Sequence, residues 1–179
     1  SDVAIDLPSL KLRVEELIES VVNIIGYLSG RAWVVDVVSA TTSDGTTTKF
    51  GWGAQEIVDT SIQRPFDLKE TQYACQLEPS LPRIFKDLRN SMIFATDTGF
   101  YCYRAMDTIK NHFERSKHLN ESQSWETMRN ALRVDRSLLD HIENFADSPR
   151  HGERIAISAP ERVAVMKHAW QVVDRFCIY

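Results

Sequence analysis

Apolar residues recur every three or four positions through most of this chain, and this helical spacing constrains its fold more than any other feature. The spacing is clearest from residue 81 onward, where successive segments each carry one apolar and one polar side. A stripe of this kind is typical of helices that pack against other helices. We therefore predict a mainly α protein of the α+β class, with a helical bundle in its second half.

The first part of the chain predicts a helix followed by a β-hairpin. Apolar residues at helical spacing indicate a helix over about residues 10–28, with Ser9 as its N-cap and Gly30 at its end. Two β-rich runs, residues 32–42 and 46–52, then flank Asp44-Gly45, a dipeptide typical of hairpin turns.

Weak signals between the hairpin and the bundle indicate a boundary. Pro65, Pro79 and the polar residues around them are typical of a linker, which can include a short helix. We predict a subdomain over residues 1–60, a linker over 61–80 and a helical domain over 81–179.

Composition narrows the class of protein. The chain is 43% hydrophobic and 26% charged, which is typical of a folded protein. Its apolar runs are too short for a membrane span, and no signal peptide is expected. Cys75, Cys102 and Cys177 are odd in number and widely separated, so we interpret them as reduced, buried thiols of a cytoplasmic protein. A net charge of −4 gives no general attraction to nucleic acid.

The C-terminal part is rich in arginine, and seven of the eight basic residues in 125–179 are of this type. Ser124 is expected to cap a helix on which Arg129, Arg133 and Arg136 follow one another along one side. We interpret these three as an ion-paired face or as contacts to phosphate or RNA. Ser158 opens a capping box, which predicts the start of the last helix.

The stretch Phe145–Gly152 is the best candidate for a site. It places Arg150 and His151 between Pro149 and Gly152, which predicts a break between two helices. Asn144 lies one helical turn earlier. The alternative is that Arg150 and His151 cap the preceding helix and bond its free carbonyl groups.

The helix Phe100–Asp107 and the later helix–turn–helix with Ala146–Gly152 at its turn carry a resemblance to a known family. Through them, the chain from about residue 81 to 179 resembles the HEPN superfamily, compact helical domains of many bacterial toxins and phage-defence proteins. The resemblance implies a homodimer and, in active members, a metal-independent endoribonuclease without a cofactor. Its motif is an arginine, four to six further residues and a histidine.

The chain departs from that motif. If His151 holds the family histidine, the arginine would stand at 144–146, where the chain has Asn144, Phe145 and Ala146. Literal matches occur at Arg136/His141 and Arg162/His168, although about one such match is expected by chance.

These observations leave two functional hypotheses. Cleaving RNA without a metal requires a group that moves protons and a positive charge beside the phosphate. The first hypothesis is a HEPN-like ribonuclease of a toxin or phage-defence system, with His151 as general acid and base, Arg150 on the phosphate and Asn144 in support. The second is a catalytically inactive helical module that dimerises or binds a partner protein. Neither requires a metal or a cofactor.

Overall fold

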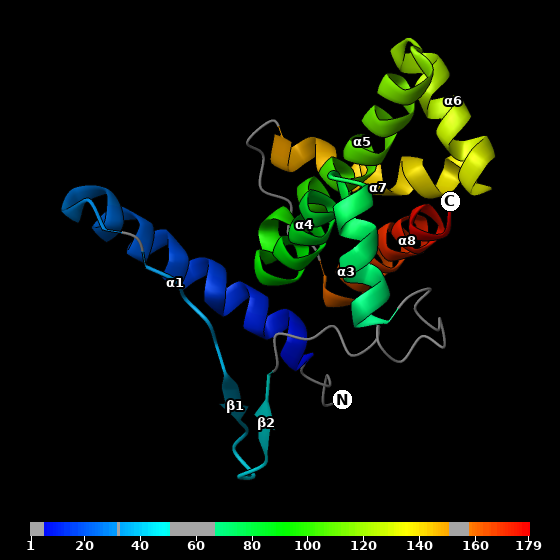
Figure 1. Cartoon of the computed structure of the whole chain (residues 1–179). Helices are drawn as coiled ribbons and strands as arrows, with labels where there is room; N and C mark the ends of the chain where they lie inside the picture. The colour runs from blue at the N-terminus through cyan, green and yellow to red at the C-terminus, as the bar shows by residue number, and fades with distance from the viewer. Residues whose placement is uncertain (1–5, 32, 51–66, 151–157) are drawn as a thin grey trace. The chain divides into compact units, whose positions relative to one another are not determined.

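The computed structural model describes residues 6–31, 33–50, 67–150 and 158–179, with only the backbone described at Tyr27 and at residues 148–150. Two compact units, Ser1–Gly53 and Ala54–Tyr179, divide the chain and are considered separately. Helices dominate both, and the first also holds a small antiparallel hairpin (Figure 1). The predicted fold class, mainly α with an N-terminal helix and a β-hairpin, is confirmed. None of the helices in the described ranges has the length and apolar character that a membrane crossing requires.

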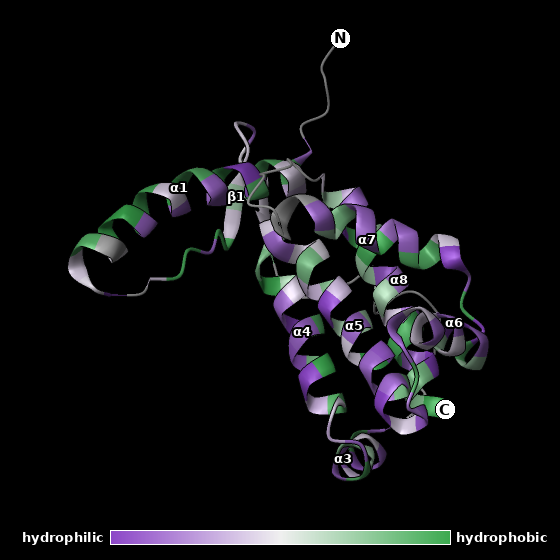
Figure 2. Cartoon of the chain, turned by 90° about the horizontal axis from the view of Figure 1, so that it is seen from above, coloured by the Kyte–Doolittle hydropathy of each residue, from purple (hydrophilic) through white to green (hydrophobic). Residues whose placement is uncertain are grey.

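Helix α1 (Leu7–Ser29) forms most of the first unit. It ends where predicted, because Gly30 adopts the left-handed conformation that favours glycine, with φ 65°. Its start differs from the prediction. Asp6 and not Ser9 occupies the N-cap position, since Pro8 fits the first turn of a helix. Hydrophobic residues gather in the C-terminal half of this helix (Figure 2).

The hairpin consists of β1 (Ser39–Thr41) and β2 (Thr47–Lys49), which pair antiparallel. Its predicted turn is confirmed: Gly45 has φ 85°, and the Asp44 carboxylate accepts the Thr46 N–H at 3.0 Å. Both strands are shorter than predicted, and residues 51–52 of the predicted second strand lie outside the described residues.

Helix α5 (Thr98–Lys117) is the centre of the second unit. It contacts α4 (Leu81–Ile93), α6 (Glu121–Leu132), α7 (Arg136–Arg150) and α8 (Ala159–Ile178), while a 3-10 turn, η1 (Ala95–Asp97), joins it to α4. Helix α3 (Leu68–Leu77) packs on α4 and lies within the predicted linker. The core between these helices contains fully buried apolar side chains: Ile84, Met106, Ile109, Phe113, Met128, Ile142, Val165 and Val172.

Two helix starts test the predicted caps. Ser158 forms the predicted capping box with Glu161 at the start of α8. The prediction for Ser124 is wrong, because α6 begins three residues earlier in a capping box between Asn120 and Gln123. Ser124 is instead buried inside the helix, where its hydroxyl donates to the Asn120 carbonyl at 2.6 Å.

Two arginines of α8 stabilise the ends of other helices. Arg162 donates to the Ser91 carbonyl at the end of α4, 2.9 Å away, and to the Thr98 hydroxyl at 2.7 Å. Arg175 donates to the Leu132 carbonyl at the end of α6, 3.3 Å away. A cation at a helix C-terminus satisfies free carbonyl groups and complements the helix dipole.

A buried ion pair joins α4 to α5. The carboxylate of Asp87, which is fully buried, accepts two hydrogen bonds from the Arg104 guanidinium, of which the bond from Nε measures 3.0 Å. Arg104 also lies over the ring of Tyr101, 4.9 Å from its centroid. Because Asp87 has no other charged partner in the described residues, this pair fixes the two helices that carry the site described below.

The predicted break at Asp147–Gly152 is wrong for its first four residues, because α7 continues through Pro149 to Arg150. Proline has no N–H, so it leaves the carbonyl group of Phe145 without its helical donor. That carbonyl lies against Gly99 at the start of α5, where an added Cβ would be 2.2 Å from the oxygen. Helices α5 and α7 therefore approach each other here more closely than any residue but glycine permits.

Candidate functional site

A cavity of about 490 Å³ lies where the junction between α3 and α4 meets the second half of α5. Its lining residues come from these two places only: Glu78, Pro79, Ser80, Arg83, Thr108, His112, Arg115 and Ser116. Small-molecule sites commonly have volumes of about 300–1,000 Å³. The cavity is thus large enough for a nucleotide-sized ligand, and seven of its eight lining residues carry polar or charged side chains.

A carboxylate and an imidazole meet in this cavity. Glu78 ends α3, and its Oε2 lies 2.8 Å from Nδ1 of His112 on α5. Its other oxygen accepts the hydroxyl of Ser80 at 2.6 Å and the Ser80 N–H at 3.0 Å. Burial opposes ionisation of Glu78, but the Ser80 hydrogen bonds and the adjacent His112 outweigh it and lower the pKa of this carboxyl group.

The bond to Glu78 fixes the state of the His112 ring. Because a carboxylate only accepts, Nδ1 is the ring nitrogen that carries the proton. The neutral ring then keeps Nε2 free to take a proton. Edge contacts with Phe113 and Phe176, at centroid distances of 5.4 and 5.1 Å, hold the ring in place.

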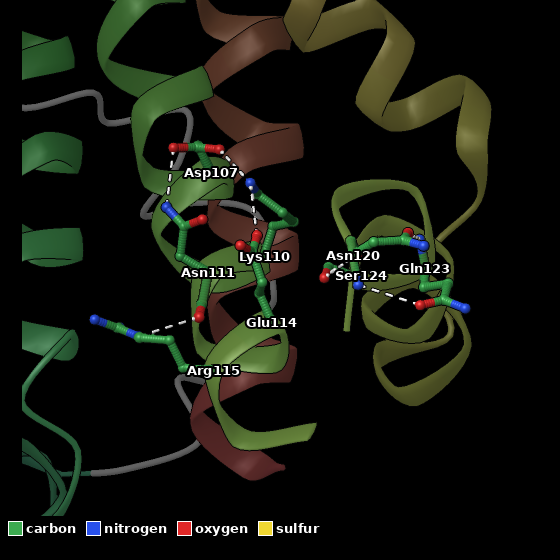
Figure 3. A network of polar contacts seen from close by, with 8 residues as sticks. All are labelled: Asp107, Lys110, Asn111, Glu114, Arg115, Asn120, Gln123 and Ser124. Atoms are coloured by element: carbon green, nitrogen blue, oxygen red, sulfur yellow. Dashed lines mark hydrogen bonds and ion pairs between the residues drawn. The ribbon is translucent and has the colours of Figure 1, made fainter. Parts of the chain in front are cut away.

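Two arginines give the cavity a positive charge. Arg83 makes no hydrogen bond or ion pair with any described residue, and its side chain is exposed. Arg115 donates only its Nε–H, to the Asn111 carbonyl at 3.2 Å, and its side chain extends away from the Asp107, Lys110 and Glu114 cluster (Figure 3). With Glu78 opposing them, the charged lining is net positive in a chain whose overall charge is −4. Guanidinium groups of this kind favour a phosphate or carboxylate ligand.

The predicted site lies elsewhere. Asn144 is exposed on α7, and Arg150 is the last residue of that helix, with no described side chain. His151 lies outside the described residues. The structure therefore brings none of these three together with the cavity residues among its described contacts, and the predicted roles of Arg150, His151 and Asn144 stay predictions.

The predicted arginine row is not on one helix. Arg129 lies in the last turn of α6, Arg133 is its C-cap with φ 55°, and Arg136 begins α7. The prediction of a continuous face is wrong because the chain leaves the helix at Arg133. Arg136 lies 3.6 Å from Asp140 and is largely exposed. Contact with phosphate or RNA by these three stays a prediction.

The two literal motif matches lead to a pair of histidines, one on α7 and one on α8. Nδ1 of His141 on α7 and Nδ1 of His168 on α8 are 2.9 Å apart. Burial, and then the neighbouring His141, lower the pKa of His168. The matching arginines do not join them: Arg162 is bonded at the end of α4, and Arg136 is paired with Asp140. One ring must accept from the other, so the contact is lost when both are protonated.

The sequence-based predictions do not include Glu78, His112, Arg83 or Arg115. A partial signal exists, since His112 and Arg115 are three residues apart and must share one face of a helix. No pattern indicates that the Glu78–Arg83 turn packs beside that face, some thirty residues away in sequence.

Residues 63–179 match a family described as "Domain of unknown function (DUF8168) C-terminal domain". The chain belongs to this family. No curated protein and no solved structure matches the chain. The DUF8168 C-terminal domain contains α3 to α8 and every residue of the cavity. Within its described residues, no three His, Cys, Asp or Glu side chains converge as metal ligands.

Proposed function

We propose that the DUF8168 C-terminal domain of this chain is a HEPN-like, metal-independent endoribonuclease whose active site is the cavity on α5. One observation carries the proposal: a histidine oriented by a carboxylate lines a cavity together with two arginines that have no acidic partner among the described residues. The proposal keeps the activity that the sequence resemblance implies and moves the chemistry from Arg150 and His151 to His112, Arg83 and Arg115.

The roles follow from the chemistry of RNA. His112 takes the proton of a ribose 2′-hydroxyl at Nε2, and the 2′-oxygen attacks the adjacent phosphorus. The bond from phosphorus to the 5′-oxygen then breaks, and that oxygen takes a proton from water. The products are a 2′,3′-cyclic phosphate and a 5′-hydroxyl end.

The other cavity residues support this step. Arg83 and Arg115 stabilise the charge that accumulates on the phosphate oxygens. Glu78 positions the His112 ring and stabilises its protonated form, so it acts through the histidine and not on the substrate. General base catalysis and oriented charge each contribute about 100-fold or more to such reactions.

A cleavage assay in EDTA tests the proposal. An RNA oligonucleotide is compared with the same sequence carrying 2′-deoxy sugars, which cannot react by this route. Wild-type protein should cleave only the RNA and leave cyclic phosphate ends. Cleavage of both substrates, or of neither, contradicts the proposal.

Matched variants locate the site. His112→Asn should lower the cleavage rate by about 100-fold or more. His118→Asn should leave it within about twofold, because His118 is an exposed left-handed cap that asparagine tolerates. His151→Ala, Asn144→Ala and Arg136→Ala test the alternative site predicted from the sequence, and loss of cleavage in these variants with normal cleavage by His112→Asn would assign the chemistry to those residues.

The second candidate is the inactive module that dimerises or binds a partner protein. The exposed apolar residues of α1 favour the part of this candidate that concerns dimerisation or partner binding, since such a stripe is rarely left uncovered. This candidate predicts no cleavage of any RNA. A place in a bacterial toxin or phage-defence system, a cytoplasmic location and a homodimer are likewise proposals that rest on the HEPN resemblance.

A further inference from the structure

Helix α1 carries an apolar residue at each central position of a heptad repeat. Counting from Leu7 as position a, the a and d positions, named here the heptad seam, are all aliphatic: Leu7, Leu10, Val14, Leu17, Val21, Ile24 and Leu28. An apolar repeat sustained over three heptads is typical of a coiled coil, and here Ile18 and Ile25 at position e widen the stripe.

The heptad seam is exposed within its own unit. Relative exposures reach 70% at Leu17, 61% at Ile24 and 76% at Leu28. By comparison, the core of the second unit buries its large aliphatic side chains to a few per cent or less. A stripe of this size is expected to be covered by another apolar surface.

The chain that follows α1 contacts it at positions b and f, opposite the heptad seam, and at position e, where Lys11 pairs with Asp36 at 3.4 Å. Glu15, at position b, accepts the Val37 N–H at 2.9 Å. Gly26, at position f, accepts the Arg31 N–H at 3.2 Å, and a Cβ there would lie 2.8 Å from the Arg31 carbonyl. One side of α1 therefore packs against its own unit, and the heptad seam is left largely uncovered within that unit.

We propose that the heptad seam pairs with α1 of a second copy of this chain in a parallel, two-stranded coiled coil. The two central a positions are Val14 and Val21, and the d positions beside them are Leu10, Leu17 and Ile24. Valine at a with leucine at d favours two parallel strands. The 23 residues of α1 give a seam about 34 Å long.

The flanking charges agree with this arrangement. In a parallel pair, position g of one helix faces position e of the next heptad of its partner. Asp6 then faces Lys11 of the second copy, which also pairs with Glu15 and Asp36 of its own unit, while Arg13 and Ser20 face Ile18 and Ile25 of the second copy. No like charges oppose each other. The interface lies in the first unit, outside residues 63–179, and does not depend on the proposed ribonuclease activity.

The mass of the full chain in solution tests the pairing. By light scattering, wild type should have twice the chain mass of 20.5 kDa. Val21→Lys should shift the mass to that of one chain, because a charge enters the seam. Asn23→Lys introduces the same charged side chain at an exposed position two residues away and should leave the dimer intact. Circular dichroism should show that the wild type and both variants are folded.

A cysteine cross-link tests the orientation. Leu10→Cys places a thiol near one end of α1, so mild oxidation should join two parallel helices through this residue. Wild type, which retains its three native cysteines, and Asn23→Cys serve as controls and should not cross-link. Three results would each overturn the proposal: a monomeric wild type, a dimer that survives Val21→Lys, or a Leu10→Cys variant that does not cross-link. A monomeric wild type would indicate that the second unit of the same chain covers the seam.

Discussion

The DUF8168 C-terminal domain holds two histidine sites that differ in what each imidazole bonds. On α5, His112 lies 2.8 Å from the carboxylate of Glu78 and lines a cavity with two arginines. Between α7 and α8, His141 and His168 bond each other at 2.9 Å. The literal arginine–histidine motifs lead to the second site, and the cavity belongs to the first.

The difference lies in what each site can do with a proton. The Glu78 carboxylate sets which ring nitrogen of His112 carries the proton in the neutral ring, and the charged residues that line the cavity around this pair are net positive. A histidine neighbour opposes protonation, and burial lowers the pKa of His168 further. The first arrangement favours catalysis at an anionic substrate, and the second favours neutral rings packed between two helices.

The largest effect is expected from Glu78→Gln. It should lower kcat for RNA cleavage by about 100-fold, or 2.7 kcal/mol, with little change in KM, because Glu78 positions the ring but does not touch substrate. Steady-state kinetics measures the split. Glu114→Gln, which alters a carboxylate on α5, the helix of His112, outside the cavity lining, is the control. A change confined to KM would show that Glu78 acts on binding and not through His112.

Gly99→Ala should destabilise the domain by about 2 kcal/mol, although alanine is the better helix former. The added Cβ meets the Phe145 carbonyl at 2.2 Å, so α5 and α7 must separate. Urea unfolding measures the change. An unchanged midpoint would mean that α7 does not pack on α5 as closely as described, and would reopen its C-terminal end as a place for a site.

Arg83→Ala and Arg115→Ala should each weaken oligonucleotide binding about tenfold, or 1.4 kcal/mol. Each loses one charge-assisted contact to phosphate, and the effect should shrink as salt is raised. Fluorescence anisotropy measures the affinity. Arg89→Ala on the same helix as Arg83, exposed but outside the cavity lining, should bind like wild type. Equal weakening by all three would indicate a general surface charge effect and no specific cavity.

The smallest effect is expected at the pair formed by His141 and His168. Because the folded pKa of His168 is lowered below its value in the unfolded chain, the unfolded state binds more protons as the pH falls below about 6.5. The free energy of unfolding should therefore decline from pH 7.5 to 5.5, and His168→Gln should reduce this decline. Cleavage by this variant at pH 7.5 should match wild type. A steeper decline in the variant would mean that His168 is protonated in the fold.

Much of the fold is readable from local patterns. Gly30, the Asp44-Gly45 turn and the Ser158 capping box each mark an element end by the conformation or hydrogen bond they supply. The predicted N-cap of α6 is wrong because two candidate capping residues lie within one helical turn of each other. Asn120 caps α6 in place of Ser124, since asparagine has a glutamine three residues later to complete the box.

The site was harder to predict, and the reasons are physical. Pro149 suggested a break, but Gly99 lies fifty residues away in sequence and its lack of a side chain gives α7 room to continue. His112 and Glu78 become a pair only because α3 and α4 turn beside α5. Such contacts depend on packing between distant elements, which periodicity and spacing do not encode.

We infer that anionic substrates bind at the cavity on α5 and not at the histidines of α7 and α8. Imidazole NMR resonances of the five histidines, assigned by single substitutions such as His112→Asn, report on both sites at once during titration with a short oligonucleotide of non-cleavable 2′-deoxy sugars. We expect the His112 signals to shift until added oligonucleotide saturates the site, while the signals of His141 and His168 do not move. Shifts at His151, or at His141 and His168, with unchanged His112 signals would contradict binding at the cavity on α5.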